Sequence, residues 1–389
     1  MKFEVNNETL TIFLSGRIDS ASAPDVEAEV NSVIAANPHT LLVFDADALE
    51  FISSAGLRVI LRVLKAEPAL KIINASTDVY DIFDMTGFTE MLTVEKGYRR
   101  MSVDGCTVIG RGAKGTVYRY NADTIIKVYK NPDSLPDIKN ERELARRAFV
   151  LGIPTAISYD VVKVGDSFGS VFELLDAKSY SQLIAEDPDN FDKYVTEYAL
   201  LVKKIHSTAV KETDMPHIKK WIYDWVEIAK GHITDCEYNK LKALIDEVPE
   251  KLFMLHCDYH TNNVMSQNGE TLLIDMDTLS HGHPVFELAN VYVTYVALGE
   301  SDPTIVENFI GLPYEKCLRI WDKFIKVYLD TEDEEKLAFV TDKVKLVAYL
   351  RLFRHMFRRQ EDKSVLAPET AYALEKLKHY IAINDTIVF

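Results

Sequence analysis

The sequence has no long apolar run and few cysteines, and each shortage argues against a class of protein. No continuous hydrophobic stretch approaches the roughly 20 residues that span a bilayer, so we expect no membrane-embedded segment. The first residues, MKFEVNNETL, have neither the basic stretch nor the apolar core of a secretory signal, and we expect a cytoplasmic protein. Four widely spaced cysteines argue against a disulfide framework or a zinc site: Cys106, Cys236, Cys257 and Cys317.

Basic charge is also in short supply. The 44 lysines and arginines face 60 aspartates and glutamates, which leaves a net charge of −16. Such a chain repels polyanions, so we expect no nucleic-acid partner. Apolar residues are plentiful at 47%, and 389 residues exceed what one hydrophobic core normally organises. We therefore expect two or three packing units.

The first 98 residues alternate between short apolar runs and amphipathic stretches. Residues 10–14 and 41–44 have the pattern of strands, and residues 23–35 carry apolar side chains at helical spacing. After Phe51, two serines precede a strongly apolar helical stretch, ISSAGLRVILRVLKA. This order predicts a small α/β domain over residues 1–98.

The segment FISSAGL, residues 51–57, makes this region resemble a STAS domain, the family named for sulfate transporters and anti-sigma factor antagonists. The family loop usually reads Asp-Ser-Ser/Thr-Gly-Leu, and a partner kinase phosphorylates a serine at the helix start. Here Ser53 stands at the aspartate position and Ala55 at the second hydroxyl position. The resemblance therefore implies a protein partner and makes Ser54, ahead of Ser53, the candidate phosphosite. Helix capping by one of the serines is the alternative, and both roles are compatible.

The chain changes character after residue 98. Residues 99–106 lose periodicity and are predicted to be a linker. Residues 107–176 are rich in strand patterns, and residues 177–389 show long helical periodicity interrupted by one motif-dense segment. This order predicts a small β-rich lobe followed by a larger helical lobe.

Three glycines open the predicted small lobe. Gly110, Gly112 and Gly115 lie in IGRGAKGTVY, and glycines at this spacing let a backbone close over nucleotide phosphates. The same spacing marks dinucleotide-binding folds, in which a helix follows the glycines. Here a β-branched, aromatic run follows, which favours the kinase type of loop.

A lysine inside a strand-like run follows one hairpin later. In kinase-like folds a strand lysine at the place of Lys127 holds the α- and β-phosphates and pairs with a glutamate on the next helix. The spacing of that helix to the turn at 152–154 favours Glu143 as the partner, and Glu141 is the alternative. An ordinary strand lysine with solvated helix charges is the competing interpretation.

The strongest signal is the pair of segments LHCDYHTNNV, residues 255–264, and LLIDMDT, residues 272–278. The pair resembles the aminoglycoside phosphotransferase and choline kinase superfamily, whose pattern is His-Gly-Asp-x-x-x-x-Asn followed by Ile-Asp. The resemblance covers roughly residues 105–389. It implies that Asp258 is the catalytic base, and that Asn263 and Asp275 hold Mg²⁺ for transfer from ATP.

The same resemblance implies further roles and shows departures. Backbone groups of Glu173 and Leu175 are expected to bind the adenine ring at the hinge after the small lobe. Cys257 replaces the usual glycine, and Glu287 stands where aspartate is usual in a helix that braces the catalytic loop. Asp277 is expected either to assist a second metal or to form a salt bridge.

A basic cluster lies near the end of the sequence. Residues 351–359, RLFRHMFRR, place basic side chains at helical spacing. A core-packed helix with a solvated basic face is the first interpretation. A docking surface for the acidic N-terminal domain is the alternative.

The predicted fold is therefore an α/β STAS-like domain followed by an α+β, two-lobed protein-kinase-like domain. Its predicted function is ATP- and Mg²⁺-dependent phosphoryl transfer to a small-molecule hydroxyl, regulated by the STAS domain. The sequence has no Asp-Phe-Gly plus Ala-Pro-Glu activation segment, which favours a small acceptor. Transfer to a protein serine, including Ser54, and nucleotide binding without transfer are the alternatives.

Overall fold

The computed structural model describes residues 1–112 and 114–389. The chain forms two compact units, one of residues 1–105 with 161–169 and the other of residues 106–160 with 170–389. In the described part of the chain, no helix is both long enough and apolar enough to cross a membrane. The boundaries of the linker and of the two lobes stay predictions.

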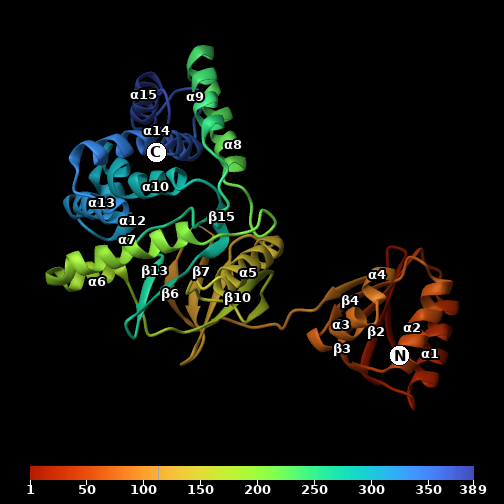
Figure 1. The fold of residues 1–389 in the computed structure, drawn as a ribbon. Coiled ribbons are helices and arrows are strands. Elements are labelled where there is room, and N and C mark those ends of the chain that lie inside the picture. The colour runs from red at the N-terminus through yellow and green to blue at the C-terminus, as the bar shows by residue number, and fades with distance from the viewer. Residues whose placement is uncertain (113) are drawn as a thin grey trace. The chain divides into compact units, whose positions relative to one another are not determined.

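The N-terminal unit contains a five-stranded sheet in the order β1-β2-β3-β4-β5 (Figure 1). Strands β2 to β5 pair in parallel, and β1 pairs antiparallel to β2. Parallel pairs need crossover connections, and the helices between the strands supply them. The elements are β1 (Lys2–Asn6), β2 (Thr9–Ile18), α1 (Ala23–Ala36), β3 (Leu41–Ile52), α2 (Ser54–Ala66), β4 (Lys71–Ala75), α3 (Thr77–Met85), α4 (Phe88–Met91) and β5 (Thr93–Lys96). The predicted α/β fold is confirmed.

The start of α2 lies directly on this sheet. A Cβ on Gly56 would stand 2.6 Å from Cγ1 of Ile52 and 2.7 Å from Cγ2 of Ile18, so only glycine fits there without a shift of its neighbours. The Ser53 hydroxyl caps the helix by accepting the N–H groups of Ala55 and Gly56 at 3.2 and 3.5 Å. Capping therefore falls to Ser53, while Ser54 is exposed at the first helical position.

A second five-stranded sheet has the order β6-β7-β8-β10-β9, and residues 161–169 of its β9 and β10 fall in the first unit by the division given above. Helix α5 lies beside this sheet in Figure 1 and packs against the turn at Met276–Thr278. The elements are β6 (Thr107–Arg111), β7 (Gly115–Arg119), β8 (Thr124–Tyr129), α5 (Leu135–Val150), β9 (Asp160–Val164) and β10 (Ser167–Glu173). This is the predicted small β-rich lobe.

The remainder of the unit is mostly helical, as predicted. Its helices are α6 (Tyr180–Glu186), α7 (Phe191–Ser207), α8 (Lys219–Lys230), α9 (Asp235–Glu247), α10 (Val285–Tyr292), α11 (Leu298–Ser301), α12 (Pro303–Ile310), α13 (Tyr314–Leu329), α14 (Glu334–Arg359) and α15 (Pro368–Ile383). Five short strands lie among them: β11 (Lys178–Ser179), β12 (Met254–Leu255), β13 (Val264–Gln267), β14 (Glu270–Leu273) and β15 (Ser280–His281).

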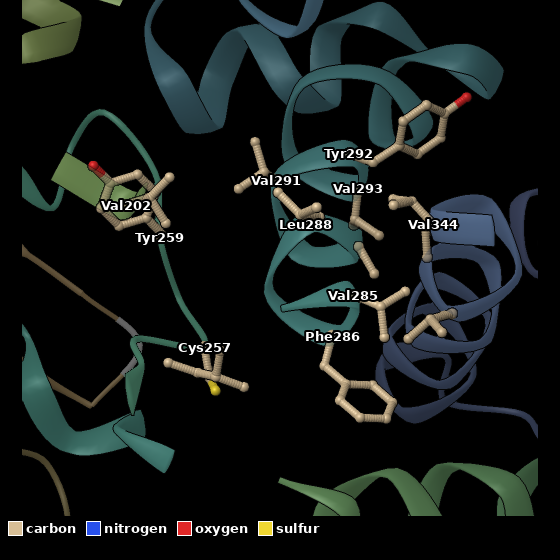
Figure 2. Packing of buried hydrophobic residues seen from close by; sticks show 14 of the residues in the cluster. Val202, Cys257, Tyr259, Val285, Phe286, Leu288, Val291, Tyr292, Val293 and Val344 are labelled. Carbon is tan, nitrogen blue, oxygen red and sulfur yellow. The ribbon is translucent and has the colours of Figure 1, made fainter. Parts of the chain in front are cut away.

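The core of this unit is built around α10, all of whose residues are buried. Figure 2 shows α10 between the segment that carries Cys257 and Tyr259 and helix α14, which carries Val344 and packs against α10. The Tyr259 ring stacks on Tyr198 of α7 with centroids 4.5 Å apart. Buried packing on both sides thus fixes the loop that follows β12.

Candidate active site

The loop between β12 and β13 carries the predicted catalytic base. Cys257 has a φ of +66°, a conformation that favours glycine and that costs other residues roughly 1–2 kcal/mol. Cys257, which stands where the family has glycine, adopts this left-handed conformation, and its thiol is buried against the core. Burial raises the pKa of Cys257 well above its usual value, so this thiol is a packing group and not a nucleophile.

A buried carboxylate holds that backbone in place. Glu287 of α10 is fully buried and accepts the Cys257 N–H at 2.9 Å, and it also accepts the N–H of His256. Burial alone would raise the pKa of Glu287, but His206 outweighs this and holds the pKa below its usual value. The expected brace of the catalytic loop is present, with glutamate serving in place of aspartate.

The Asp258 carboxylate lies between an imidazole and a guanidinium group. Its Oδ2 lies 3.7 Å from Nε2 of His260, and its Oδ1 lies 3.7 Å from Nη2 of Arg351. Burial would raise the pKa of Asp258, but His260 and Arg351 outweigh it and hold the pKa below the usual range. A carboxylate that stays ionised is suited to orienting an acceptor hydroxyl and receiving its proton as transfer proceeds.

Hydrogen bonds to backbone carbonyls bring the second motif against this loop. The Ile274 N–H donates to the Asn263 carbonyl at 3.0 Å, and the Thr278 hydroxyl donates to the His256 carbonyl at 2.7 Å. Asn263 Nδ2 donates to the Asp258 carbonyl at 3.0 Å, which directs its Oδ1 away from that bond. The structure therefore assembles Asp258, Asn263 and Asp275 from the two sequence motifs.

The strand lysine joins the two lobes of this site. Lys127 of β8 lies 2.7 Å from Oδ1 of Asp275 and 3.1 Å from Oε1 of Glu141 on α5. Burial would lower the pKa of Lys127, but these two carboxylates outweigh it and raise the pKa. The prediction that Glu143 is the glutamate partner of Lys127 was wrong. That side chain pairs with Arg146 and Arg147 at the helix surface, and Glu141 lies on the face of α5 that meets β8.

This contrast gives a matched pair of variants. We expect Glu141→Gln to lower kcat/KM for ATP by about tenfold or more, because Lys127 loses a charged partner that positions it. We expect Glu143→Gln, two residues along the same helix, to change kcat/KM less than twofold, since exposed pairs contribute little. Steady-state kinetics in ATP measures both, and equal losses in the two variants would refute the assignment.

The glycine loop closes over the same region. A Cβ on Gly115 would stand 2.5 Å from the Val128 carbonyl oxygen, so glycine is required where β7 meets β8. Gly110 and Gly112 have no such close neighbour, and Gly112 donates its N–H to the Gly115 carbonyl at 2.9 Å. Ala113, in the middle of the motif, lies outside the described residues.

Lys114 ties the glycine loop to the second motif through an ion pair with Asp277. Burial and the neighbouring Asp275 raise the pKa of Asp277. The salt-bridge alternative for Asp277 is therefore realised, and its carboxylate also lies within 4.8 Å of those of Asp275 and Glu141.

The predicted hinge follows β10. The Leu174 N–H donates to the Asp123 carbonyl at 2.8 Å. Because a trans peptide directs its C=O opposite to its N–H, the Glu173 carbonyl points away from Asp123. Leu175 is half-buried in the connection to β11. Adenine binding by the backbone of Glu173 and Leu175 stays a prediction.

The oxygen groups gathered around the second motif fit a hard divalent cation. Among the described residues, one group of His, Cys, Asp or Glu side chains has metal-binding proximity, and it consists of Glu141, Asp275 and Asp277. Oxygen ligands of this kind, together with an amide oxygen such as Oδ1 of Asn263, are those that Mg²⁺ prefers. The chemistry of the donor set therefore agrees with the expected cofactor.

Comparison with known proteins identifies the family of this site. A model of the phosphotransferase enzyme family matches residues 105–312, which span the glycine loop, Lys127, Asp258, Asn263 and Asp275. The chain belongs to this family. The prediction of a phosphotransferase with a hydroxyl as acceptor is confirmed.

The N-terminal unit has its own relatives. A STAS domain model matches residues 1–100. The chain is 33% identical over 85 residues to the putative anti-sigma factor antagonist BtrV of Bordetella bronchiseptica (strain ATCC BAA-588 / NCTC 13252 / RB50), covering 21% of this chain and 72% of that protein. The predicted STAS resemblance is confirmed.

Matches among solved structures include three proteins of low sequence identity. The aminoglycoside phosphotransferase APH(4)-Ia is 13% identical, with a TM-score of 0.49 and coverage of 71% of this chain and 93% of that one. The gentamicin complex of APH(2″)-IIa is 14% identical, with a TM-score of 0.46 and coverage of 76% and 95%. A choline/ethanolamine kinase family protein from Mesorhizobium loti is 14% identical, with a TM-score of 0.46 and coverage of 72% and 88%.

Two residues beside Asp258 were not predicted to belong to the site. His260 lies two positions from the base, and the motif gave it no role. Arg351 of α14 donates to the Cys257 carbonyl at 3.1 Å and approaches Asp258 from 93 residues further along the chain. The spacing of the basic cluster indicated its shared helix face, but nothing in the sequence showed that this face meets the catalytic loop.

Proposed function

We propose that this phosphotransferase moves the γ-phosphate of ATP to a hydroxyl of a small molecule, and that its STAS domain regulates the transfer through a protein partner. One observation supports the proposal above the others. Lys127, Asp258, Asn263 and Asp275, which come from three separate segments, converge on one site with Glu141. A fold that only bound nucleotide would have no need for an ionised base at the acceptor side.

The proposed reaction is a single in-line displacement. The acceptor oxygen forms a bond to the γ-phosphorus as the bond from that phosphorus to the β,γ-bridging oxygen breaks, and ADP leaves. Asp258 orients the hydroxyl and takes its proton. Lys127 holds the α- and β-phosphates, and Gly110, Gly112 and Gly115 let the backbone close over them.

Asp275 and Asn263 would hold Mg²⁺ in this scheme. When bound, the ion neutralises charge on the transferring phosphate. Lys127 already places one positive charge against Asp275, which indicates a site shaped to balance carboxylates with cations. Positioning and charge balance are the main requirements of phosphoryl transfer, since the transition state needs little covalent assistance.

Transfer to a protein serine is the second candidate, and one observation favours it. Ser54 is exposed at the first position of α2, while Ser53 performs the capping. An added phosphate there would meet the unpaired N–H groups of the first helical turn, where negative charge is stabilised. A partner kinase or this enzyme's own second domain would be the source of the phosphate.

One labelling experiment separates these candidates. The full chain is incubated with γ-labelled ATP and Mg²⁺, alone and with panels of small hydroxyl compounds. We expect label on a small molecule and none on the protein. Label on the protein that disappears in Ser54→Ala would support serine transfer instead, and ATP binding without turnover under all conditions would refute transfer altogether.

A further inference from the structure

The end of α14 presents a cluster of positive charge beside the catalytic base. Residues 351–359 contain four arginines and no acidic residue, in a chain whose net charge is −16. Arg351, Arg354, His355 and Arg358 recur at the i, i+3, i+4 and i+7 positions of one helix face. We call these four side chains, with Arg359, the basic face.

The basic face is joined to Asp258 at one end. Arg351 donates to the Cys257 carbonyl and lies 3.7 Å from Asp258. Arg351 and Arg354 both lie over the ring of Trp225 on α8, at 5.5 and 5.9 Å from its centroid. Figure 1 shows α8 beside α14, and the two helices are in contact. Trp225 therefore fixes two arginines next to the position where the acceptor hydroxyl must bind.

The charges of the basic face are poorly compensated. Among the described residues, Arg354, Arg358 and Arg359 form no ion pair with a carboxylate, and Nε of Arg354 is buried without a hydrogen-bond partner. Burial and the neighbouring Arg358 and Arg351 lower the pKa of Arg354. The exposed Asp224 on α8 has the opposite effect on that pKa but does not outweigh them. Burial and three of these arginines lower the pKa of His355 to about 4. Arginines held this close together, with few carboxylates near them, are typical of a site that binds an anion.

We propose that the phosphate acceptor is a small molecule with an anionic group of its own, bound by Arg354 and Arg358 while its hydroxyl lies against Asp258. This inference rests on the proposed function. Arg354 and Arg358 lie about 4.5 and 10 Å beyond Arg351 along the helix axis, at about 1.5 Å per residue. The long side chains of Arg354 and Arg358 can reach back toward a phosphate or carboxylate that lies a few bonds from the hydroxyl. In the transfer, the acceptor oxygen bonds to the γ-phosphorus, ADP leaves, and Asp258 takes the proton.

A cationic acceptor would meet charge of its own sign here. An aminoglycoside or choline would place ammonium groups against the basic face, and like charges brought together without a counterion are repelled. The proposed anionic acceptor therefore differs in charge from aminoglycosides and choline.

Paired acceptors test the proposal on the full chain. With γ-labelled ATP and Mg²⁺, we compare glycerol with glycerol 3-phosphate and glycerate, and ribose with ribose 5-phosphate, alongside choline and gentamicin. We expect the anionic member of a pair to have a kcat/KM at least about tenfold above its neutral partner, since charged hydrogen bonds are of that strength. The comparison of glycerol 3-phosphate with glycerate shows whether the anionic group of the preferred acceptor is a phosphate or a carboxylate. Preference for neutral or cationic compounds would overturn the proposal while leaving phosphoryl transfer intact.

Variants of the basic face supply the second readout. We expect Arg354→Gln with Arg358→Gln to raise KM for the anionic acceptor by about a hundredfold while KM for ATP changes little, and Arg354→Lys to recover part of the loss. Arg58→Gln with Lys65→Gln, exposed on α2, makes the same change in net charge and should leave both KM values unchanged. Equal effects of the two double variants would overturn the proposal.

A binding measurement decides the matter even if the panel lacks the natural acceptor. With the nucleotide site saturated by AMP-PNP and Mg²⁺, we titrate inorganic phosphate by calorimetry. Binding that weakens at least about tenfold in the Arg354→Gln, Arg358→Gln variant supports the site. Absent or unchanged binding would overturn it. Label on Ser54 that depends on these arginines would also overturn it, because the basic face would then hold an acidic protein segment.

Discussion

Replacing Asp258 by asparagine is expected to lower kcat by about a thousandfold, because a positioned base contributes roughly 10²–10⁴ in rate. Asparagine keeps the shape of the side chain and its place beside His260 and Arg351, but it cannot take the hydroxyl proton. ATP affinity should be little changed, since Asp258 is not among the groups that contact Lys127.

The measurement is single-turnover transfer from γ-labelled ATP, with nucleotide binding followed separately. Asp189→Asn, at an exposed position, is the control and should behave as wild type.

The pH dependence of activity gives a further test of the charge on Asp258. Because His260 and Arg351 hold the pKa of Asp258 below its usual range, its carboxylate remains ionised through mild acid, and activity should not fall between pH 7 and 5 through Asp258. Wild-type kcat in Asp258→Asn would refute its role as base.

Replacing Asp275 by asparagine is expected to reduce kcat/KM by at least about a hundredfold and to raise the Mg²⁺ concentration needed for half-maximal activity. The substitution removes a negative charge from the carboxylate cluster with Glu141 and Asp277, and it removes the 2.7 Å ion pair with Lys127. Charge-assisted bonds and oxygen ligands are both weakened when a carboxylate becomes an amide.

A magnesium titration distinguishes the loss of activity in Asp275→Asn from the loss in Asp258→Asn. Asp258→Asn should keep the wild-type Mg²⁺ dependence, whereas Asp275→Asn should shift it. Asp277→Asn tests the neighbouring carboxylate: a salt bridge to Lys114 alone predicts a smaller loss than that of Asp275→Asn, and an equal shift would give Asp277 a metal-binding role. An unshifted Mg²⁺ dependence in Asp275→Asn would contradict its assignment.

Several site residues were predictable because the chemistry of the site requires them at fixed spacings within short segments. The catalytic loop places Asp258 and Asn263 five residues apart, and the next hairpin supplies Asp275, so spacing along the chain already encodes proximity. The partner of Lys127 was not predictable in the same way. Glu141 and Glu143 are two residues apart on one helix, and only the rotation of α5 against β8 decides which of them faces the lysine.

The backbone shape at Cys257 shows a similar division. The sequence shows a cysteine where the family has glycine, but the left-handed φ and the Glu287 carboxylate that fixes it are properties of the packed loop. At the STAS serines, the sequence left capping and modification open. The fold assigns the cap to Ser53 and leaves Ser54 exposed.

Local motifs and hydrophobic periodicity were enough to identify the two domain types and the phosphotransferase family, and they predicted the residues of the base and the metal site. Only the tertiary structure placed Glu141 on Lys127 and the basic face of α14 beside Asp258. Both are contacts between elements distant in the chain, and the packing of α5 against β8 and of α14 against α10 and α8 sets their geometry. The charge around the acceptor site is therefore a property of the fold.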